Sequence, residues 1–379
     1  MKIAFCLFAA LLISGGSLSL QAATGLDWLD NNTNLTFYGD LRLRYEVDWD
    51  SQTAAGAMRD DRHRGRIRAR GGLNYRLTDQ WSLGARVRTG NSRSQTSPHL
   101  TFVADDGAQD ELSFVFDRYF LQYQSRPWTF WGGRNITPFW QQNELFWDQD
   151  ATIAGVAGIH DQQLGAGNLT ATAGAFFLPD GGYQYNGQLV GAQLKYTLPV
   201  NSFQFTWAGG LHYMHGEDDP NFLLTRNGER DYLIGVASAQ WRVPLRERLP
   251  LTLGADLFHN FEDYSAAELA PFPPSEEDEN LGYVLSAQLG QLSNRHDWLV
   301  AYYYAHIETF AVNASYAQDD WHRFGNGPQS TSSNFEGHEI RVAYAISKSI
   351  NLMGRLFFVE EITTRQDGHR FRLDLNWSF

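Results

Sequence analysis

The sequence predicts an all-β protein, a transmembrane antiparallel barrel of about sixteen strands. Three observations predict this fold class: polar and apolar residues alternate with period two along most of the chain, the connections between these segments are long and short in turn, and the last segment alternates up to a terminal phenylalanine. In a strand, successive side chains point to opposite faces, so each such segment has one polar face and one apolar face.

Residues 64–77 show the alternation most clearly. Arginine or asparagine stands at most even positions, and apolar residues such as Ile67 and Leu73 stand at odd ones. Segments 33–47 and 81–89 repeat the pattern, so three consecutive strands are expected to share one arginine-rich face. The arginines expected on this face are Arg42, Arg44, Arg66, Arg68, Arg70, Arg86 and Arg88.

The arginine face could lie on the outside or the inside of the protein. A soluble protein buries apolar residues, whereas an outer-membrane barrel turns apolar side chains to lipid and polar ones to a wet lumen. After residue 23 there is no run of about 18 apolar residues, which excludes an ordinary spanning helix but leaves barrel strands open. An aromatic content of 14% with a mean hydropathy of −0.39 suits a wet barrel, but it would also fit a carbohydrate-binding β-protein.

Sixteen segments have the alternation and the flanking turn residues of strands. Most have about the 9–11 residues with which a tilted strand crosses a bilayer. They are residues 33–47, 64–77, 81–89, 112–123, 128–134, 151–160, 168–177, 187–196, 202–213, 231–241, 251–261, 282–292, 298–308, 337–346, 350–360 and 369–379.

Long and short connections alternate between these segments. Short connections are residues 78–80, 124–127, 197–201, 293–297 and 347–349, and long ones are residues 48–63, 90–111, 135–150, 214–230, 262–281 and 309–336. An outer-membrane barrel with short periplasmic turns and long extracellular loops produces this alternation. A β-sandwich has no reason to keep it along the whole chain.

Residues 1–23 have the features of a secretory signal peptide: Lys2, an apolar run from residue 3 to 13, and small residues before a cleavage site after Ala22 or Ala23. The only cysteine, Cys6, lies in this segment, so disulfides are not expected in the mature chain. We expect residues 24–379 to form one barrel domain. Removing Lys2 from the 30 basic residues leaves 29 against 43 acidic ones, a mature net charge of −14, which argues against nucleic acid as a partner.

The last segment alternates without a break and ends on Phe379. It resembles the C-terminal signature of Gram-negative outer-membrane barrels, in which the final aromatic residue and apolar residues two, four and six before it guide assembly. The match covers Phe379, Trp377, Leu375 and Leu373. The resemblance implies that the barrel assembly machinery recognises these residues.

Other segments also resemble a family. GDLRLRYEV from Gly39, LGARVRTGNSRSQTSPHLTF from Leu83, FDRYFLQY from Phe116 and GGRNITPFWQQNELFWDQDATIAGVAG from Gly132 are similar to the bacterial family known as putative porins, and more distantly to alginate-export-type barrels. The resemblance covers about residues 33–158 and the C-terminus. It implies a passive channel for small hydrophilic solutes in the outer membrane of a Gram-negative bacterium, in contact with lipid and lipopolysaccharide. Porins of this size are often homotrimers.

Two interpretations of the arginine face remain open. A positive wall along the lumen would draw anions and orient dipolar solutes. Alternatively, the arginines only hydrate the lumen surface. Arginine keeps its charge in confined sites and presents a rigid planar fork to oxyanions.

The connection 135–150 is the candidate constriction loop. In general porins, which this chain resembles in strand number, the loop at this position folds into the barrel. Here its acidic residues, Glu144, Asp148 and Asp150, stand among aromatic ones, and aromatic patches are normally buried against another surface. Acids across the pore from the arginines would create a transverse field. The alternative is an outer loop packed on the rim or on a neighbouring subunit.

Other candidate sites have ordinary interpretations. The acidic run at residues 276–279 fits a solvated outer loop, and a divalent cation shared with lipopolysaccharide is the alternative. His212 and His215 are three apart in a strand, point to opposite faces and make a poor metal chelate. We therefore expect no metal site and no cofactor.

Two functions compete with the channel. A barrel enzyme would need a nucleophile and a base within about 3 Å of each other, and no Ser-His or Asp-His constellation stands out in the sequence, although distant residues could converge. A plugged barrel would have a structural or adhesive role. The sequence favours the channel and predicts that the protein is not an enzyme.

Overall fold

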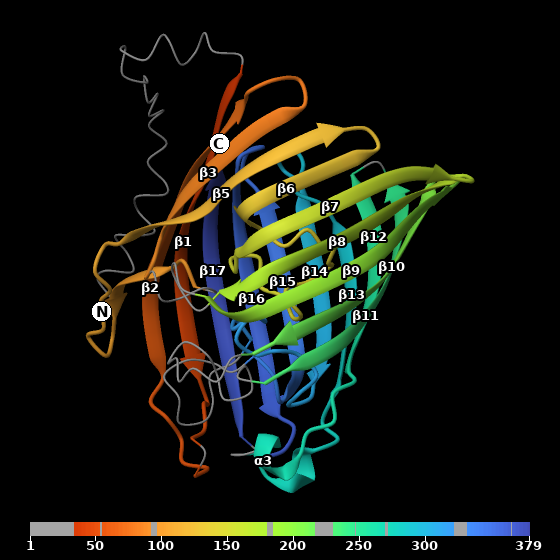
Figure 1. The fold of residues 1–379 in the computed structure, drawn as a ribbon. Helices are drawn as coiled ribbons and strands as arrows, with labels where there is room; N and C mark the ends of the chain where they lie inside the picture. The colour runs from red at the N-terminus through yellow and green to blue at the C-terminus, as the bar shows by residue number, and fades with distance from the viewer. Residues whose placement is uncertain are drawn as a thin grey trace, which may run out of the picture.

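The computed structural model describes residues 34–53, 55–91, 97–179, 185–216, 230–246, 248–269, 272–321, 332–364 and 366–379. Within these residues, seventeen strands form one sheet in which all neighbours are antiparallel, and β17 (Asp367–Ser378) pairs with β1 (Leu35–Trp49). The sheet is therefore closed into a barrel (Figure 1). The predicted signal peptide, residues 1–23, lies outside the described residues and stays a prediction.

The other strands follow in chain order. They are β2 (Arg62–Arg76), β3 (Trp81–Thr89), β4 (Leu100–Ala104), β5 (Phe114–Ser125), β6 (Trp128–Asn135), β7 (Ile153–Leu164), β8 (Gly167–Pro179), β9 (Tyr185–Val200), β10 (Phe203–His215), β11 (Tyr232–Arg246), β12 (Leu249–Asn260), β13 (Leu281–Gly290), β14 (Trp298–Ile307), β15 (Phe335–Ala345) and β16 (Ile350–Glu361).

Strands β3 and β4 share one position in the barrel. Both pair with β2, β3 through Arg70 and Arg88 and β4 through Arg66 and Thr101. The seventeen segments therefore make a barrel of sixteen strands, which confirms the predicted fold class. Each of the sixteen predicted segments corresponds to a strand, several of which extend a few residues beyond the predicted bounds. Among the described residues, the one strand that was missed is β4, five residues inside the predicted loop 90–111.

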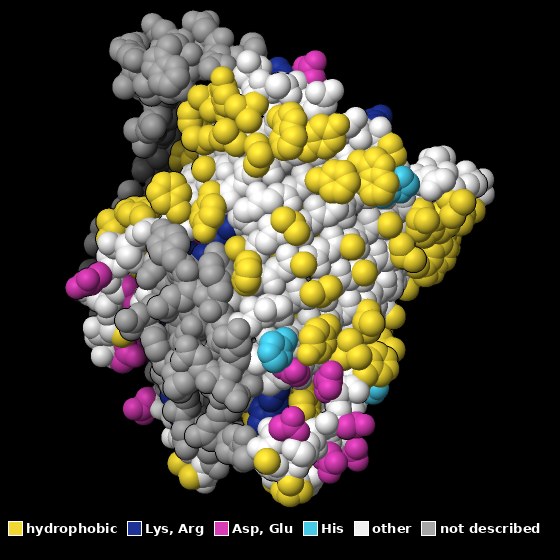
Figure 2. All heavy atoms as spheres, viewed as in Figure 1, with side chains coloured by type: hydrophobic (Ala, Val, Ile, Leu, Met, Phe, Trp, Pro, Cys, Tyr) yellow, Lys and Arg dark blue, Asp and Glu magenta, His cyan; other side chains and the backbone are white. Residues whose placement is uncertain are grey.

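The outside of the barrel is apolar and the inside is mixed. Val156 and Leu194 are 61% and 58% exposed, whereas their chain neighbours Ala157 and Gln193 are each 5% exposed and point inward. Figure 2 shows hydrophobic side chains over the barrel wall, with the visible acidic side chains gathered mainly toward one end. An apolar outer face next to a polar interior is typical of a barrel in a bilayer.

The two ends of the barrel differ as the sequence predicted. Short turns such as residues 77–80 and 346–349 lie at the end near the C-terminus, and the other end carries the connection that contains α3 (Ala266–Leu269) and the 3₁₀ turn η1 (Pro274–Glu276) (Figure 1). In the described part of the chain, no helix is long and apolar enough to cross a membrane.

Candidate functional site

The connection from β6 to β7, residues 136–152, folds into the barrel. Gln193 on β9 forms two hydrogen bonds with the backbone of Trp140. Its Oε1 accepts from Trp140 N at 2.8 Å, and its Nε2 donates to Trp140 O at 2.9 Å. Asp256 on β12 accepts hydrogen bonds from Gln142 Nε2 at 3.0 Å and Asn143 Nδ2 at 2.7 Å. These partners lie on inward-facing positions of distant strands, so the loop crosses the inside of the barrel.

Aromatic side chains fix the same loop to the inner wall. His212 on β10 is 1% exposed and lies between the rings of Phe139 and Phe146, with centroid distances of 4.6 and 4.9 Å. The rings are thus buried against the barrel, which explains why an inserted loop contains so many of them. His215 is exposed and contacts Asp231, so the two histidines point to opposite faces, as the sequence indicated.

A second connection also folds inward. Residues 308–321, which follow β14, are mostly buried and pack on the first loop. Gln318 donates from its backbone N to Glu144 O at 3.0 Å and from Nε2 to Glu144 Oε2 at 2.9 Å, and Asp148 N donates to Tyr316 O at 2.7 Å. The prediction that residues 309–336 form an outer loop is therefore wrong for residues 309–321. The run is rich in small and apolar residues, which can be packed against the interior.

The predicted arginines lie on the inner face, and most are paired with acids. Asp40 accepts from Arg68 at 2.8 Å and from Arg70 at 2.7 Å. Five further carboxylates on the inner face each lie between two arginines in the same way: Glu46 (Arg64, Arg372), Asp48 (Arg62, Arg370), Asp117 (Arg86, Arg88), Glu339 (Arg341, Arg355) and Asp374 (Arg42, Arg44).

The sequence indicated a wall dominated by positive charge. The structure shows instead a wall on which arginines alternate with carboxylates. Twelve guanidinium groups share six carboxylates, which leaves a surplus of positive charge but few bare arginines. Asp40 and Glu46 stand at even positions of the same strand as Arg42 and Arg44. The alternation of the sequence alone could therefore have shown that these acids share the inner face with the arginines. Asp117 and Asp374 come from other strands and could be placed only by the pairing of the sheet.

Acids of the two inserted loops add counter-ions from the lumen side. Asp150 contacts Arg68 at 3.4 Å and Arg70 at 2.5 Å. Burial opposes ionisation of Asp150, but these guanidinium groups hold its pKa below the usual range. Asp150 thus touches the arginine wall directly and does not face it across an open pore.

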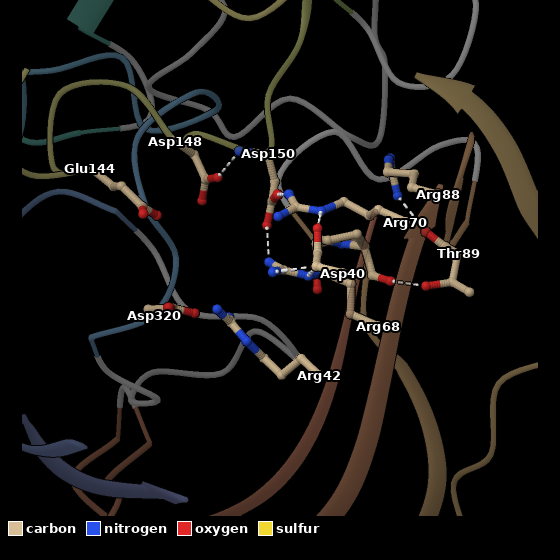
Figure 3. A network of polar contacts seen from close by, with 12 residues as sticks. Asp40, Arg42, Arg68, Arg70, Arg88, Thr89, Glu144, Asp148, Asp150 and Asp320 are labelled. Atoms are coloured by element: carbon tan, nitrogen blue, oxygen red, sulfur yellow. Dashed lines mark hydrogen bonds and ion pairs between the residues drawn. The ribbon is translucent and has the colours of Figure 1, made fainter. Parts of the chain in front are cut away.

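Asp320, in the second loop, was not predicted as a site residue. It contacts Arg355 at 3.0 Å and Arg44 at 3.9 Å, and it also pairs with Arg372. Although burial opposes it, attraction to Arg372 and Arg44 holds the pKa of Asp320 well below the usual range. In Figure 3, the side chain of Arg42 extends toward Asp320 across the space between the wall and the loops.

Glu144 and Asp148 behave differently from Asp150. Neither forms an ion pair with an arginine in the described residues. Burial first, and then the charge of Asp150, raises the pKa of Glu144; burial and the charge of Glu144 raise the pKa of Asp148 well above the usual range. The three acids that the sequence grouped together therefore differ in their surroundings: Asp150 is paired with arginines, whereas Glu144 and Asp148 are buried next to other acids.

The predicted assembly residues close the barrel. Phe379 N donates to Gly39 O at 3.0 Å, and Gly39 N donates to Phe379 O at 2.9 Å. The Phe379 side chain is 64% exposed, and its ring lies 5.3 Å from that of Trp377. Leu375 and Leu373 pair with β1 at Leu43 and Tyr45. Recognition of these residues by assembly factors stays a prediction.

The predicted solvated acidic run is only partly exposed. Glu276 is 7% exposed and accepts a hydrogen bond from Thr309 Oγ1 at 2.8 Å, whereas Glu277 and Asp278 are exposed. Across the described ranges, no group of three or more histidine, cysteine, aspartate or glutamate side chains is arranged to hold a metal ion.

Comparisons with known proteins agree with this architecture. Residues 47–196 match the family described as Putative porin. The resemblance seen in the sequence is thereby confirmed. No curated protein matches the chain in sequence.

Solved outer-membrane porins share the fold. Against OprB of Pseudomonas putida the TM-score is 0.59 at 10% identity, with 94% of this chain and 96% of that chain covered. Against OmpF of Salmonella typhi, in complex with daunomycin, it is 0.52 at 11% identity, covering 91% and 97%. OmpT of Vibrio cholerae, in its trimer form, gives 0.51 at 11% identity, covering 91% and 99%. The chain thus has a porin barrel with little sequence in common with these proteins.

Proposed function

We propose that this protein is an outer-membrane porin, a water-filled channel for passive diffusion of small hydrophilic solutes or ions, exported by the signal peptide at residues 1–23. The observation that carries the proposal is a closed barrel with an apolar outside, crossed inside by an acidic loop that contacts an arginine wall. The family match over residues 47–196 supports it.

The charge distribution supports selective passage. The two inserted loops narrow the lumen, so a solute passes close to the wall. Within about 8 Å, the Debye length at physiological salt, guanidinium charges are incompletely screened. Asp150 and Asp320 offset only part of the surplus positive charge of the wall, so we expect a mildly anionic preference.

Conductance tests the proposal. The purified mature protein in a planar bilayer should give stepwise ion currents. In a salt gradient, replacing Arg66, Arg68 and Arg86 together with glutamine should shift the reversal potential toward cation selectivity. Replacing Glu144 and Asp148 with glutamine and asparagine should shift it toward anion selectivity.

A matched control separates local from general charge effects. Replacing Arg76, Arg242 and Arg246 with glutamine removes the same charge near the short turns, away from the inserted loops. This variant should leave the reversal potential nearly unchanged. Identical reversal potentials for all variants would show that the arginine wall and the loop do not border the ion path.

A plugged structural barrel is the second candidate, because residues 308–321 fill part of the lumen. Absence of conductance from a correctly folded barrel would favour it. An enzyme is the third, and we propose that the protein has no catalytic role, since the family and fold comparisons support a channel.

We further propose that the barrel lies in the outer membrane of a Gram-negative bacterium, with its short turns in the periplasm. Lipid and lipopolysaccharide would surround it, and assembly as a homotrimer is supported by the trimer form of a structural neighbour. Amine reagents added to intact cells should not reach Lys348, in the short turn 346–349. Unheated gel migration at three times the monomer mass would support the trimer.

A further inference from the structure

We propose that the arginine wall contains a specific oxyanion-binding recess formed by Arg66, His99 and Arg42. This inference deepens the proposed channel function by naming a class of solute, small molecules that carry a carboxylate or a similar oxyanion. It rests on three side chains, each of which has at least one nitrogen without a hydrogen-bond partner among the described residues.

His99 is the buried member of the recess. It lies in the connection from β3 to β4 and is 9% exposed. Its carbonyl oxygen and Ser97 Oγ accept from Arg66 Nη2 at 3.4 and 3.0 Å, so this connection holds the end of the Arg66 side chain. His99 Nε2 and Arg66 Nε are both buried without a hydrogen-bond partner. Unpaired buried donors are costly, which makes a ligand at this place favourable.

Arg66 also differs from the other wall arginines because no carboxylate lies within ion-pair distance of it among the described residues. It forms no ion pair with any residue that the structure describes, whereas Arg44 is paired with Asp374 and Arg68 with Asp40. The strand register places Arg66 opposite Arg44, and Arg68 opposite Arg42. The recess therefore contains a wall arginine that has no carboxylate partner within ion-pair distance among the described residues, next to two strand positions that are also arginine.

Arg42 supplies free donors at the lumen side. Its Nε donates to Asn376 Oδ1 at 2.7 Å and lies 3.8 Å from Asp374. No hydrogen bond joins its terminal nitrogens to another side chain in the described ranges. In Figure 3 the Arg42 side chain points away from the Arg68 and Asp40 pair and toward Asp320 of the second loop. Its terminal nitrogens therefore lie between the wall and that loop, where a solute in the lumen would meet them.

The chemistry of these groups selects an oxyanion. Guanidinium groups donate hydrogen bonds and accept none. Burial first, and then the charges of Arg44 and Arg66, hold the pKa of His99 well below the usual range, so its imidazole is neutral and offers one N–H. A planar carboxylate matches the N–H fork of arginine in geometry and charge. A chloride ion would offset the charge but has no pair of coplanar oxygens to match this fork.

Titration of the full mature protein, folded in detergent, tests the recess. The probe is sodium acetate, with acetamide as its neutral counterpart and inorganic phosphate as a second oxyanion. Binding is measured by ligand-observed NMR at a constant chloride concentration. Acetate should bind saturably and acetamide should not. Arg66→Gln and His99→Leu should each weaken acetate binding about tenfold or more, as expected for loss of a hydrogen bond to a charged group.

Two variants serve as controls. His99→Gln places an amide nitrogen near the position of Nε2 and should retain most of the affinity. Arg62→Gln removes the same charge from the same strand, but Arg62 is paired with Asp48 outside the recess, so acetate affinity should not change. Gel migration before and after heating verifies that each variant is folded.

The outcomes are distinct. Non-saturable acetate binding, or equal weakening by Arg62→Gln and Arg66→Gln, would overturn the recess and leave only a diffusely positive wall. Tighter binding of phosphate than of acetate would support the recess and assign it to a tetrahedral oxyanion. Conductance is measured on the same preparations: a conducting barrel without acetate binding refutes the recess alone, and acetate binding without conductance refutes the channel alone.

Discussion

The indole ring of Trp147 stacks on the phenol ring of Tyr316, with 5.0 Å between the ring centroids and 12° between the planes. The two residues come from different inserted loops, and their side chains are 2% and 1% exposed. Next to this stack, Asp148 N donates to Tyr316 O. The two loops therefore form one packed unit inside the barrel, and displacement of either should affect both.

Removing the stack should loosen this unit. Tyr316→Ala deletes a buried aromatic pair that contributes about 0.5–1.5 kcal/mol beyond the burial of its area. The inserted loops should then leave the lumen more often, which raises mean single-channel conductance and current noise. Tyr316→Phe keeps the ring and should change the conductance less than Tyr316→Ala does. Equal conductance for the alanine variant and the wild type would mean that the stack does not hold the loops.

Asp320 should be the main electrostatic anchor of the second loop. It contacts Arg44, Arg355 and Arg372, so Asp320→Asn leaves three guanidinium groups with less compensation. Breaking a buried ion pair costs about 3–5 kcal/mol, which should release residues 308–321 from the wall.

Limited proteolysis measures this release. The Asp320→Asn barrel should be cleaved within the second loop at protease concentrations that leave the wild type intact. Asp319→Asn changes the same charge at the adjacent residue, which forms no ion pair with a described residue, and should remain resistant. If both variants are equally sensitive, the ion pairs of Asp320 are not the anchor.

Asp148 and Asp150 should have opposite effects on docking of the first loop. The pKa of Asp148 is raised in the docked loop, mainly by burial and by Glu144, so the docked state favours its protonated form. Its contribution is most favourable below the ordinary value of about 3.9 and is lost as pH rises through the raised pKa. The pKa of Asp150 is lowered against burial by Arg68 and Arg70, so its contribution is present above about 3.9 and is lost as pH falls through the lowered pKa.

Hydrogen exchange across residues 136–152 measures this difference. At neutral pH, Asp148→Asn should increase protection relative to the wild type, because asparagine resembles the protonated acid. At pH near 3 the two proteins should be alike. Asp150→Asn should reduce protection at neutral pH. Reduced protection in Asp148→Asn at neutral pH would contradict this account of the loop.

The strands were predictable because alternation is a local property. Residues 64–77 display both faces of β2 in the sequence itself, and most other strands do the same. Strand β4 has only five residues, Leu100–Ala104, which is too short for a clear period. Its place beside β2 depends on β3 ending at Thr89, and this is visible only once the sheet is formed.

The constriction was only partly predictable because its contacts are long-range. The aromatic residues of residues 135–150 indicated a buried loop. Nothing local shows that Asp320 reaches Arg44 and Arg372, because these residues come from opposite ends of the chain and meet only when β17 pairs with β1. Likewise, the sequence shows how many arginines lie on the inner face, but it does not show which of them lack a paired carboxylate.

Phe379 should matter more for assembly than for stability of the finished barrel. Its side chain is 64% exposed, and its hydrogen bonds to Gly39 use only its backbone. Phe379→Ser should therefore lower the yield of folded protein in the membrane several-fold, while refolding of the purified chain in detergent remains close to that of the wild type. Phe379→Trp keeps a terminal aromatic residue and should restore the membrane yield. Heat-dependent gel migration reports folded barrel in both settings. A normal membrane yield for Phe379→Ser would contradict the recognition model. Equal losses in the membrane and in detergent would instead assign a role in barrel closure to the Phe379 ring, which lies beside Gly39.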